Sequence, residues 1–194
     1  LNWANVVIPK PEKVKFYQEA PIDTPIIEED ILGYFVWIPR FEYRLFNVNY
    51  EKVPEQTIEV NFVSNKTPKK EILENGLFYT HPAFSAKYDN VSHELNGFWI
   101  AKFEPTLNNG IVEIKPGKPT LVNINTAEMW IHAINIKKFY QNNIDSRIIT
   151  NMEWGAIAYL SFSQYSKQNN PNFNGIHKNI FLNSARGNSN WDNL

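Results

Sequence analysis

The sequence predicts a fold of the α+β class, with strands and helices in separate stretches of one chain. Runs of aromatic and β-branched residues between residues 33 and 104 alternate with polar residues, which is typical of half-buried strands. Two capping boxes, at Asn125 and at Thr150, each open an apolar segment with a Glu three residues later. In such a box the two residues satisfy each other's free backbone N–H groups, so both segments are predicted to be helices.

Composition sets limits on the function. The chain has 194 residues, enough to bury a full core, and 43% of them are hydrophobic. Its 19 basic and 20 acidic residues give a net charge of -1 without a basic run, so nucleic acid is not an expected partner. No apolar run approaches the ~20 residues that span a bilayer. Without cysteine, the chain has no disulfide, thiolate nucleophile or thiolate metal site.

The first 30 residues contain four prolines with charges between them. Since proline lacks the N–H that a sheet ladder needs, residues 1–30 are predicted to be an extended N-terminal arm or a linker. Residues 31–194 then form a single α+β domain, which we expect to be incomplete at its C-terminus.

The strands are predicted in order along the chain. Residues 33–44 form the first, with Pro39 at an edge or a bulge, and residues 56–63 form the second after a turn over 45–55. A further strand covers 97–104 and ends at Pro105, and a short one covers 111–114.

Both helices are predicted to have an apolar side. The helix capped by Thr150 and Glu153 should lie in the core, with Trp154 fixing its first turn against a neighbour. Its apolar residues are Met152, Ala156, Ile157, Tyr159 and Leu160. The helix opened by Asn125 and Glu128 ends near Tyr140 and has Ala127, Trp130, Ile131, Ile134 and Ile136 on its apolar side.

No catalytic set, cofactor site or metal site stands out. The four histidines, His81, His93, His132 and His177, lack the spacing of metal ligands. Glu28, Glu29 and Asp30 could hold a cation, but acids also favour a helix start. Glu42, Glu104 and Glu153 lie among aromatic residues, where a raised pKa would suit catalysis; pairing with Arg40, Arg44 or Lys102, or helix capping, is the commoner explanation.

Composition shifts to asparagine from Gln168 onward, which predicts a surface loop. Within it lie amide donors, a guanidinium and an aromatic face that suit hydrogen bonding to sugar hydroxyls with stacking. The candidate ligand-binding residues are Asn183, Arg186, Asn188, Asn190 and Trp191. Loop solubility is the alternative explanation for the same residues.

Four stretches together resemble one family, the formylglycine-generating-enzyme-like domain, a relative of the C-type lectin fold. They are Phe35–Tyr43, Thr80–Phe84, Glu94–Glu104 and Asn151–Leu160, which contains Glu153-Trp154-Gly155-Ala156. Such domains occur in phage structural proteins and in pilin-like or surface proteins of low-GC Gram-positive bacteria. The resemblance implies an irregular, twisted antiparallel sheet with two main helices, and loops displayed for receptor binding. Its structural positions here would include Trp37, Trp99, Thr150, Glu153 and Trp154.

Two departures from the family matter. The true formylglycine-generating enzymes work through paired cysteines, which this chain lacks, so the resemblance implies no catalytic residue here. The family also continues to a Gly-Asn-Val-Trp-Glu-Trp motif. Residues 187–192 resemble this motif only distantly and occur earlier in the sequence than the family places it.

The expected function is a non-enzymatic structural component of a virion or surface appendage, with loops that attach to a glycan or protein receptor. Its expected partners are other virion or appendage subunits in an oligomer. Its expected localisation is the virion or the extracellular cell surface. A purely structural decoration or connector subunit of a phage particle or pilus is the alternative, and an enzyme on the same scaffold is a third.

Overall fold

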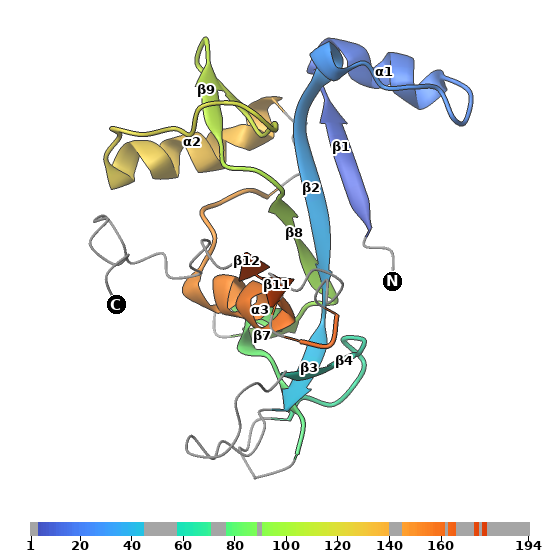
Figure 1. Cartoon of the computed structure of the whole chain (residues 1–194), viewed down its shortest axis with the longest axis vertical. Helices are drawn as coiled ribbons and strands as arrows, with labels where there is room; N and C mark the ends of the chain where they lie inside the picture. Colours follow the sequence, from blue (N-terminus) through green and yellow to red (C-terminus); the bar gives the residue numbers. More distant parts are fainter. Residues whose placement is uncertain are drawn as a thin grey trace. The chain divides into compact units, whose positions relative to one another are not determined.

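The computed structural model describes residues 4–44, 58–70, 77–88, 91–139, 145–161, 163–165, 173–174 and 176–177 (Figure 1). These residues form three α-helices and small antiparallel sheets, so the α+β class is confirmed. The chain divides into two compact units. Unit 1 comprises residues 1–38 and 98–149, and unit 2 comprises residues 39–97 and 150–194.

Unit 1 is built on a three-stranded sheet in the order β1-β2-β8. These strands are β1 (Asn5–Pro9), β2 (Ile31–Pro39) and β8 (Gly97–Ala101). A hairpin of β9 (Thr106–Asn108) and β10 (Ile111–Glu113) continues onto β2, since Ile114 exchanges backbone hydrogen bonds with Leu32 and Tyr34. Helix α2 (Thr126–Phe139) contacts β10.

Residues 5–19, within the predicted arm, form a strand and a helix. β1 pairs with β2 in antiparallel register, from Asn5 opposite Val36 to Pro9 opposite Ile31, and α1 (Pro11–Glu19) follows. The prolines allow this because each stands where its missing N–H is not needed, Pro9 at the end of the strand and Pro11 in the first turn of the helix.

A polar cluster around Asp30 joins α1 to the rest of unit 1. The Tyr17 hydroxyl donates to the Asp30 carboxylate over 2.8 Å, and the Lys13 ammonium lies 3.4 Å from the same group. The Tyr17 bond, with Lys13 beside it, lowers the pKa of Asp30. Tyr34 donates to Glu28, which raises the tyrosine pKa to about 12. These bonds fix the 3₁₀ turn Glu28–Asp30 (η1) beside α1.

Unit 2 contains a three-stranded sheet in the order β4-β3-β5 and a separate hairpin. The strands of the sheet are β3 (Phe41–Arg44), β4 (Glu59–Phe62) and β5 (Tyr79–Thr80). The hairpin joins β6 (Ser85–Tyr88) to β7 (Val91–Glu94), after the 3₁₀ turn η2 (Pro82–Phe84). Helix α3 (Asn151–Ser161) contacts η2, and two-residue strands β11 (Phe173–Asn174) and β12 (Ile176–His177) pair with each other.

The predicted strand over 33–44 is two strands, because the ladder breaks at Arg40, directly after Pro39. The predicted burial of α3 is partly wrong. Met152 is 56% exposed on α3, and Trp130 and Ile131 are about half exposed on α2. Ala156 and Leu160 are buried, as expected.

The division into an arm and a single domain over residues 31–194, with an incomplete C-terminus, stays a prediction. Among the residues described, no helix has the length and apolar character needed to cross a bilayer.

Candidate functional site

The centre of unit 2 is a histidine enclosed by aromatic rings. The His81 ring centroid lies 5.3 Å from that of Phe41, 5.6 Å from Tyr43, 5.1 Å from Tyr159 and 6.2 Å from Phe84. Phe41 and Tyr43 come from β3, Phe84 from η2 and Tyr159 from α3. Three of the four stretches that resemble the formylglycine-generating-enzyme-like domain therefore meet in one cluster of side chains.

His81 is held neutral by this environment. It is 4% exposed, and burial lowers its pKa to about 4. Its Nδ1 accepts a hydrogen bond of 3.2 Å from the Ala83 backbone N–H and so caps η2. Since Nδ1 is an acceptor, the ring proton of the neutral form lies on Nε2. A Cβ added at Gly155 would lie 3.7 Å from that nitrogen, so α3 passes close to the imidazole edge.

The arrangement gives His81 a packing role. Its Nδ1 is used inside the turn, and the surrounding rings and α3 leave it 4% exposed. A general base needs a position within hydrogen-bond reach of a substrate proton. An imidazole this enclosed instead stabilises the contact between η2 and α3.

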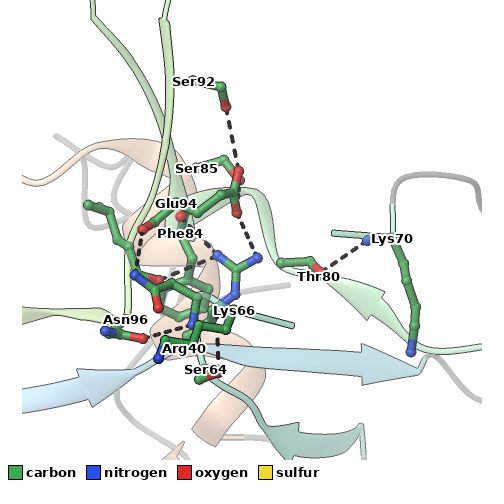
Figure 2. Close-up of polar contacts among 12 residues, drawn as sticks. Arg40, Ser64, Lys66, Lys70, Thr80, Phe84, Ser85, Ser92, Glu94 and Asn96 are labelled. Carbon is green, nitrogen blue, oxygen red and sulfur yellow. Dashed lines mark hydrogen bonds and ion pairs between the residues drawn. The ribbon is translucent and has the colours of Figure 1, made fainter. Parts of the chain in front are cut away.

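A second buried group, Arg40, joins separate segments of unit 2 (Figure 2). Arg40 is fully buried, and its Nη1 donates to the carbonyl oxygens of Phe84 at 3.2 Å and Leu95 at 3.4 Å. Its Nη2 lies 2.7 Å from a carboxylate oxygen of Glu94. The Arg40 backbone N–H donates to the Asn96 carbonyl, so both main chain and side chain tie the start of β3 to the end of the β6–β7 hairpin.

Glu94 has further donors around it. The hydroxyls of Ser85, at 3.2 Å, and Ser92, at 3.5 Å, donate to its two oxygens, as Figure 2 shows. The carboxylate is 27% exposed, whereas the guanidinium is not exposed at all. A buried guanidinium costs much desolvation free energy unless it is paired, and the bonds to Glu94 and to the two carbonyl oxygens offset that cost.

Glu42 makes a comparable contact on the neighbouring part of β3. Its side chain is 5% exposed, and one oxygen accepts a 2.9 Å hydrogen bond from the Lys70 ammonium. Its other oxygen, Oε1, is buried and has no hydrogen-bond partner among the described residues. The Lys70 backbone N–H donates to the Thr80 hydroxyl, as Figure 2 shows, and the Thr80 N–H donates to the Lys70 carbonyl. The partner of Glu42 is thus Lys70 and not the arginines expected from the sequence.

The capping residues predicted for α3 make the expected bonds. The Thr150 backbone N–H donates to the Glu153 carboxylate at 2.9 Å, and the Glu153 N–H donates to the Thr150 hydroxyl at 3.3 Å. Glu153 is 6% exposed, and Trp154 is half-buried. The reciprocal bonds of Asn125 and Glu128, at 2.9 and 3.0 Å, start α2 in the same way.

Two of the three tryptophans predicted as structural, Trp37 and Trp99, lie in unit 1. Trp37 is half-buried on β2, and Trp99 is 48% exposed on β8. Their ring centroids are 5.2 Å apart, so they form one aromatic pair across adjacent strands. The acid Glu104, also predicted among buried aromatics, is exposed.

The five candidate ligand-binding residues, Asn183, Arg186, Asn188, Asn190 and Trp191, lie outside the described residues. Glu28 accepts from Tyr34 and Asp30 pairs with Lys13 and Tyr17, while Glu29 is exposed. Within the described ranges, no group of three or more His, Asp or Glu side chains could hold a metal ion.

The sequence did not predict the roles of Arg40 and His81 in unit 2. Arg40 stands on the polar side of an alternating strand, which predicts exposure, and what buries it is a hairpin more than 40 residues away. The sequence identifies His81 only as a histidine without the spacing of metal ligands. A local signal existed, because a side-chain acceptor followed by proline is typical of a helix start, here the start of η2.

Comparison of the chain with models of protein families, with curated proteins and with solved structures finds no match.

Proposed function

We propose that the chain is a non-enzymatic structural component of a virion or surface appendage. In this proposal, a scaffold similar to the formylglycine-generating-enzyme and C-type-lectin fold displays loops that attach to a glycan or protein receptor. Its partners are other subunits of the particle or appendage, and it acts at the virion or cell surface.

The observation that carries the proposal is the aromatic cluster around His81. Residues of three family-resembling stretches, among them Phe41, Phe84 and Tyr159, contact one another or the His81 ring. Such convergence is expected if these stretches are the shared core of a scaffold. Loops on a rigid core are the usual place for recognition residues, because the core holds them in position.

The acids that would favour an enzyme also support this proposal. Glu42 accepts from Lys70, and Glu153 caps α3, so both carboxylates are engaged within unit 2. Glu104 is exposed in unit 1. The enzyme alternative requires two of these carboxylates to converge on a substrate.

Attachment is tested by binding of the purified chain to a glycan array and to cells of candidate hosts. We expect binding by the wild type and loss of binding by Arg186→Ala and Trp191→Ala, each with a stability change below ~0.5 kcal/mol, the usual effect of a surface substitution. His81→Phe serves as the matched control, because it alters the core and should leave attachment intact. Binding by all variants alike would move the site elsewhere.

A decoration or connector subunit is the second candidate function. Electron microscopy of an intact particle labelled on this chain separates the two, since an attachment protein lies at a distal tip and a connector lies between other subunits. Absence of the chain from any particle or appendage would contradict both.

A further inference from the structure

Four of the eight glycines in the chain follow asparagine. In two of these pairs, Asn96-Gly97 and Asn109-Gly110, the structure describes both residues. An asparagine before glycine is open to attack on its side-chain amide by the glycine nitrogen, because glycine has no Cβ to hinder the approach. The two pairs carry the same reactive groups, so the surrounding fold decides how their reactivity differs.

Asn109 and Gly110 form the turn of the β9–β10 hairpin. Asn108 pairs with Ile111, so these two residues are the whole connection between the strands. Their φ angles of 50° and 81° are both positive, as in a type I′ turn. Both residues are exposed, and a Cβ built on Gly110 would meet no described atom within 4 Å. The turn therefore faces solvent.

The peptide group between Asn109 and Gly110 takes no part in the hydrogen bonds of the hairpin. The flanking pair, Asn108 and Ile111, closes the ladder instead. Among the described residues, neither the Asn109 carbonyl nor the Gly110 N–H makes a backbone hydrogen bond. The side-chain amide of Asn108 donates to Glu113 at 3.1 Å, whereas that of Asn109 has no partner in the described part of the chain. This peptide group can therefore rotate without loss of a hydrogen bond.

Asn96 is exposed as well, but hydrogen bonds fix it at two points. Its carbonyl oxygen accepts from the Arg40 N–H at 2.7 Å, and its side-chain Oδ1 accepts from the Asn65 N–H at 2.7 Å. Because a peptide group is planar, the Gly97 nitrogen can turn towards the Asn96 side chain only if the Asn96 carbonyl turns with it. That rotation breaks the bond to Arg40.

We infer that Asn109 is a site of spontaneous deamidation. The Gly110 N–H loses its proton to hydroxide, and the nitrogen forms a bond to Asn109 Cγ. The bond from Cγ to Nδ2 breaks, and Nδ2 leaves as ammonia after taking a proton from water, which restores the hydroxide and leaves a cyclic succinimide. The reaction is intramolecular, so the reacting groups are already held together.

Water then opens the ring in one of two ways. Cleavage between the Gly110 nitrogen and Asn109 Cγ gives aspartate, and cleavage between that nitrogen and the main-chain carbonyl carbon of Asn109 gives isoaspartate. Overall one water is consumed and one ammonia is released, and no atom is oxidised or reduced.

Either product alters the hairpin. Both products add a carboxylate at the exposed turn, and isoaspartate also inserts its Cβ into the main chain between β9 and β10. A turn lengthened in this way no longer fits the two-residue connection, so the pairing of Asn108 with Ile111 should loosen. This inference does not rest on the proposed attachment function, whose named residues lie in a different part of the sequence.

Deamidation is followed by peptide mapping and mass spectrometry of the folded chain in a mildly alkaline buffer. We expect aspartate and isoaspartate to accumulate at Asn109 about tenfold or more faster than at Asn96 in the same sample, because holding a reacting group away from its target costs rates of this order. In concentrated urea the two sites should react at similar rates, since both asparagines precede glycine. The rate at Asn109 should also rise with pH, as deprotonation of the Gly110 N–H requires.

Asn109→Gln is the matched variant, because it keeps an amide but places it one methylene farther from the Gly110 nitrogen. Little product should form at residue 109 in this variant, and the rate at Asn96 should equal that of the wild type. Equal rates at Asn96 and Asn109 in the folded chain would overturn the inference, and so would an unreacted Asn109 in the folded chain. A tenfold difference that persists in urea would also contradict it, by placing the cause in the local sequence and not in the fold.

Discussion

Among the described residues, unit 1 and unit 2 differ in how many large apolar side chains are exposed. Among the described residues of unit 2, Phe41, Phe84 and Val60 are fully buried, and three large apolar residues, Leu77, Val91 and Met152, are exposed. In unit 1 the buried set includes Ile31, Leu32, Val112 and Ile114, and the exposed set is longer. It comprises Phe16, Ile22, Ile26, Ile27, Trp99, Leu107, Val122, Met129, Trp130, Ile131 and Ile149.

The difference follows from which segments meet. In unit 2, segments far apart in sequence converge on His81 and Arg40, so each aromatic ring has neighbours on several sides. In unit 1, β8, β9 and α2 each carry large apolar residues that are exposed, such as Trp99, Leu107 and Trp130. Apolar content therefore predicts a core only where several elements close around it, and substitutions in the two units should have unequal effects.

The largest effect is expected at Phe84. Its ring is fully buried against Phe41 and His81, so Phe84→Ala removes many contacts and leaves a cavity. The free energy of unfolding should fall by about 3–5 kcal/mol in urea denaturation. Phe16→Ala is the matched control in unit 1, since Phe16 is 59% exposed, and should cost less than ~0.5 kcal/mol. Similar losses in both variants would remove the contrast between the units.

The next effect is a pH dependence at His81. Burial lowers its pKa in the folded chain to about 4, below the ordinary value of 6.5, so between these values the unfolded state binds more protons. The stability contributed by the neutral ring is fully present above pH 6.5 and is lost as the pH falls towards 4. The loss approaches about 1.4 kcal/mol per pH unit, or on the order of 3 kcal/mol in total.

His81→Phe isolates this term, because phenylalanine fills the site without titrating. The difference in unfolding free energy between wild type and variant should shift by that amount from pH 7 to pH 4. A difference that stays constant over this range would show that the imidazole is solvated in the folded chain.

A smaller loss is expected at Arg40. Arg40→Met keeps much of the side-chain volume but removes the donors to Phe84, Leu95 and Glu94. Glu94 is partly exposed and keeps its serine donors, so we expect a cost of about 2 kcal/mol rather than the 3–5 of a fully buried pair. In a double-mutant cycle with Glu94→Gln, the two single costs should sum to more than the double cost. Strict additivity would contradict the pairing.

The smallest of these effects lies at the α3 cap. Thr150→Ala removes the hydroxyl that accepts from Glu153 N–H, which should reduce stability by about 1 kcal/mol. Thr150→Ser keeps the hydroxyl and should restore most of the loss in thermal denaturation. An equal loss in both variants would place the effect in the threonine methyl group instead.

Patterns within a few residues of sequence predicted the elements whose contacts are local, above all the two capped helices. Both capped helices follow from pairs three residues apart, and their hydrogen bonds are present at Asn125 and at Thr150. The Asn109-Gly110 turn is equally readable from the sequence, but only the strand over 111–114 was predicted there. Proline density did not predict the strand and the helix within residues 5–19, because the position of a proline within an element matters more than the number of prolines.

Contacts between distant segments could not be read in the same way. The periodicity of α2 marks an apolar side but does not say that another element covers it, and Trp130 and Ile131 on that side are about half exposed. Burial of Arg40 depends on the β6–β7 hairpin, and the position of Leu121 depends on the hydrogen bond from its N–H to the Pro105 carbonyl. The candidate attachment residues from Asn183 to Trp191 stay a prediction from composition.

Hydroxyl-radical footprinting of the whole chain tests the contrast between the units most directly, because it reports the solvent access of each side chain. We predict heavy labelling of Met129 and Trp130 on α2, and protection of Phe41 and Phe84 in unit 2. Met152, exposed on α3, provides an internal reference for an accessible side chain in unit 2. Protection of Trp130 to the level of Phe84, with Met152 labelled, would contradict the account by showing that the apolar side of α2 is covered.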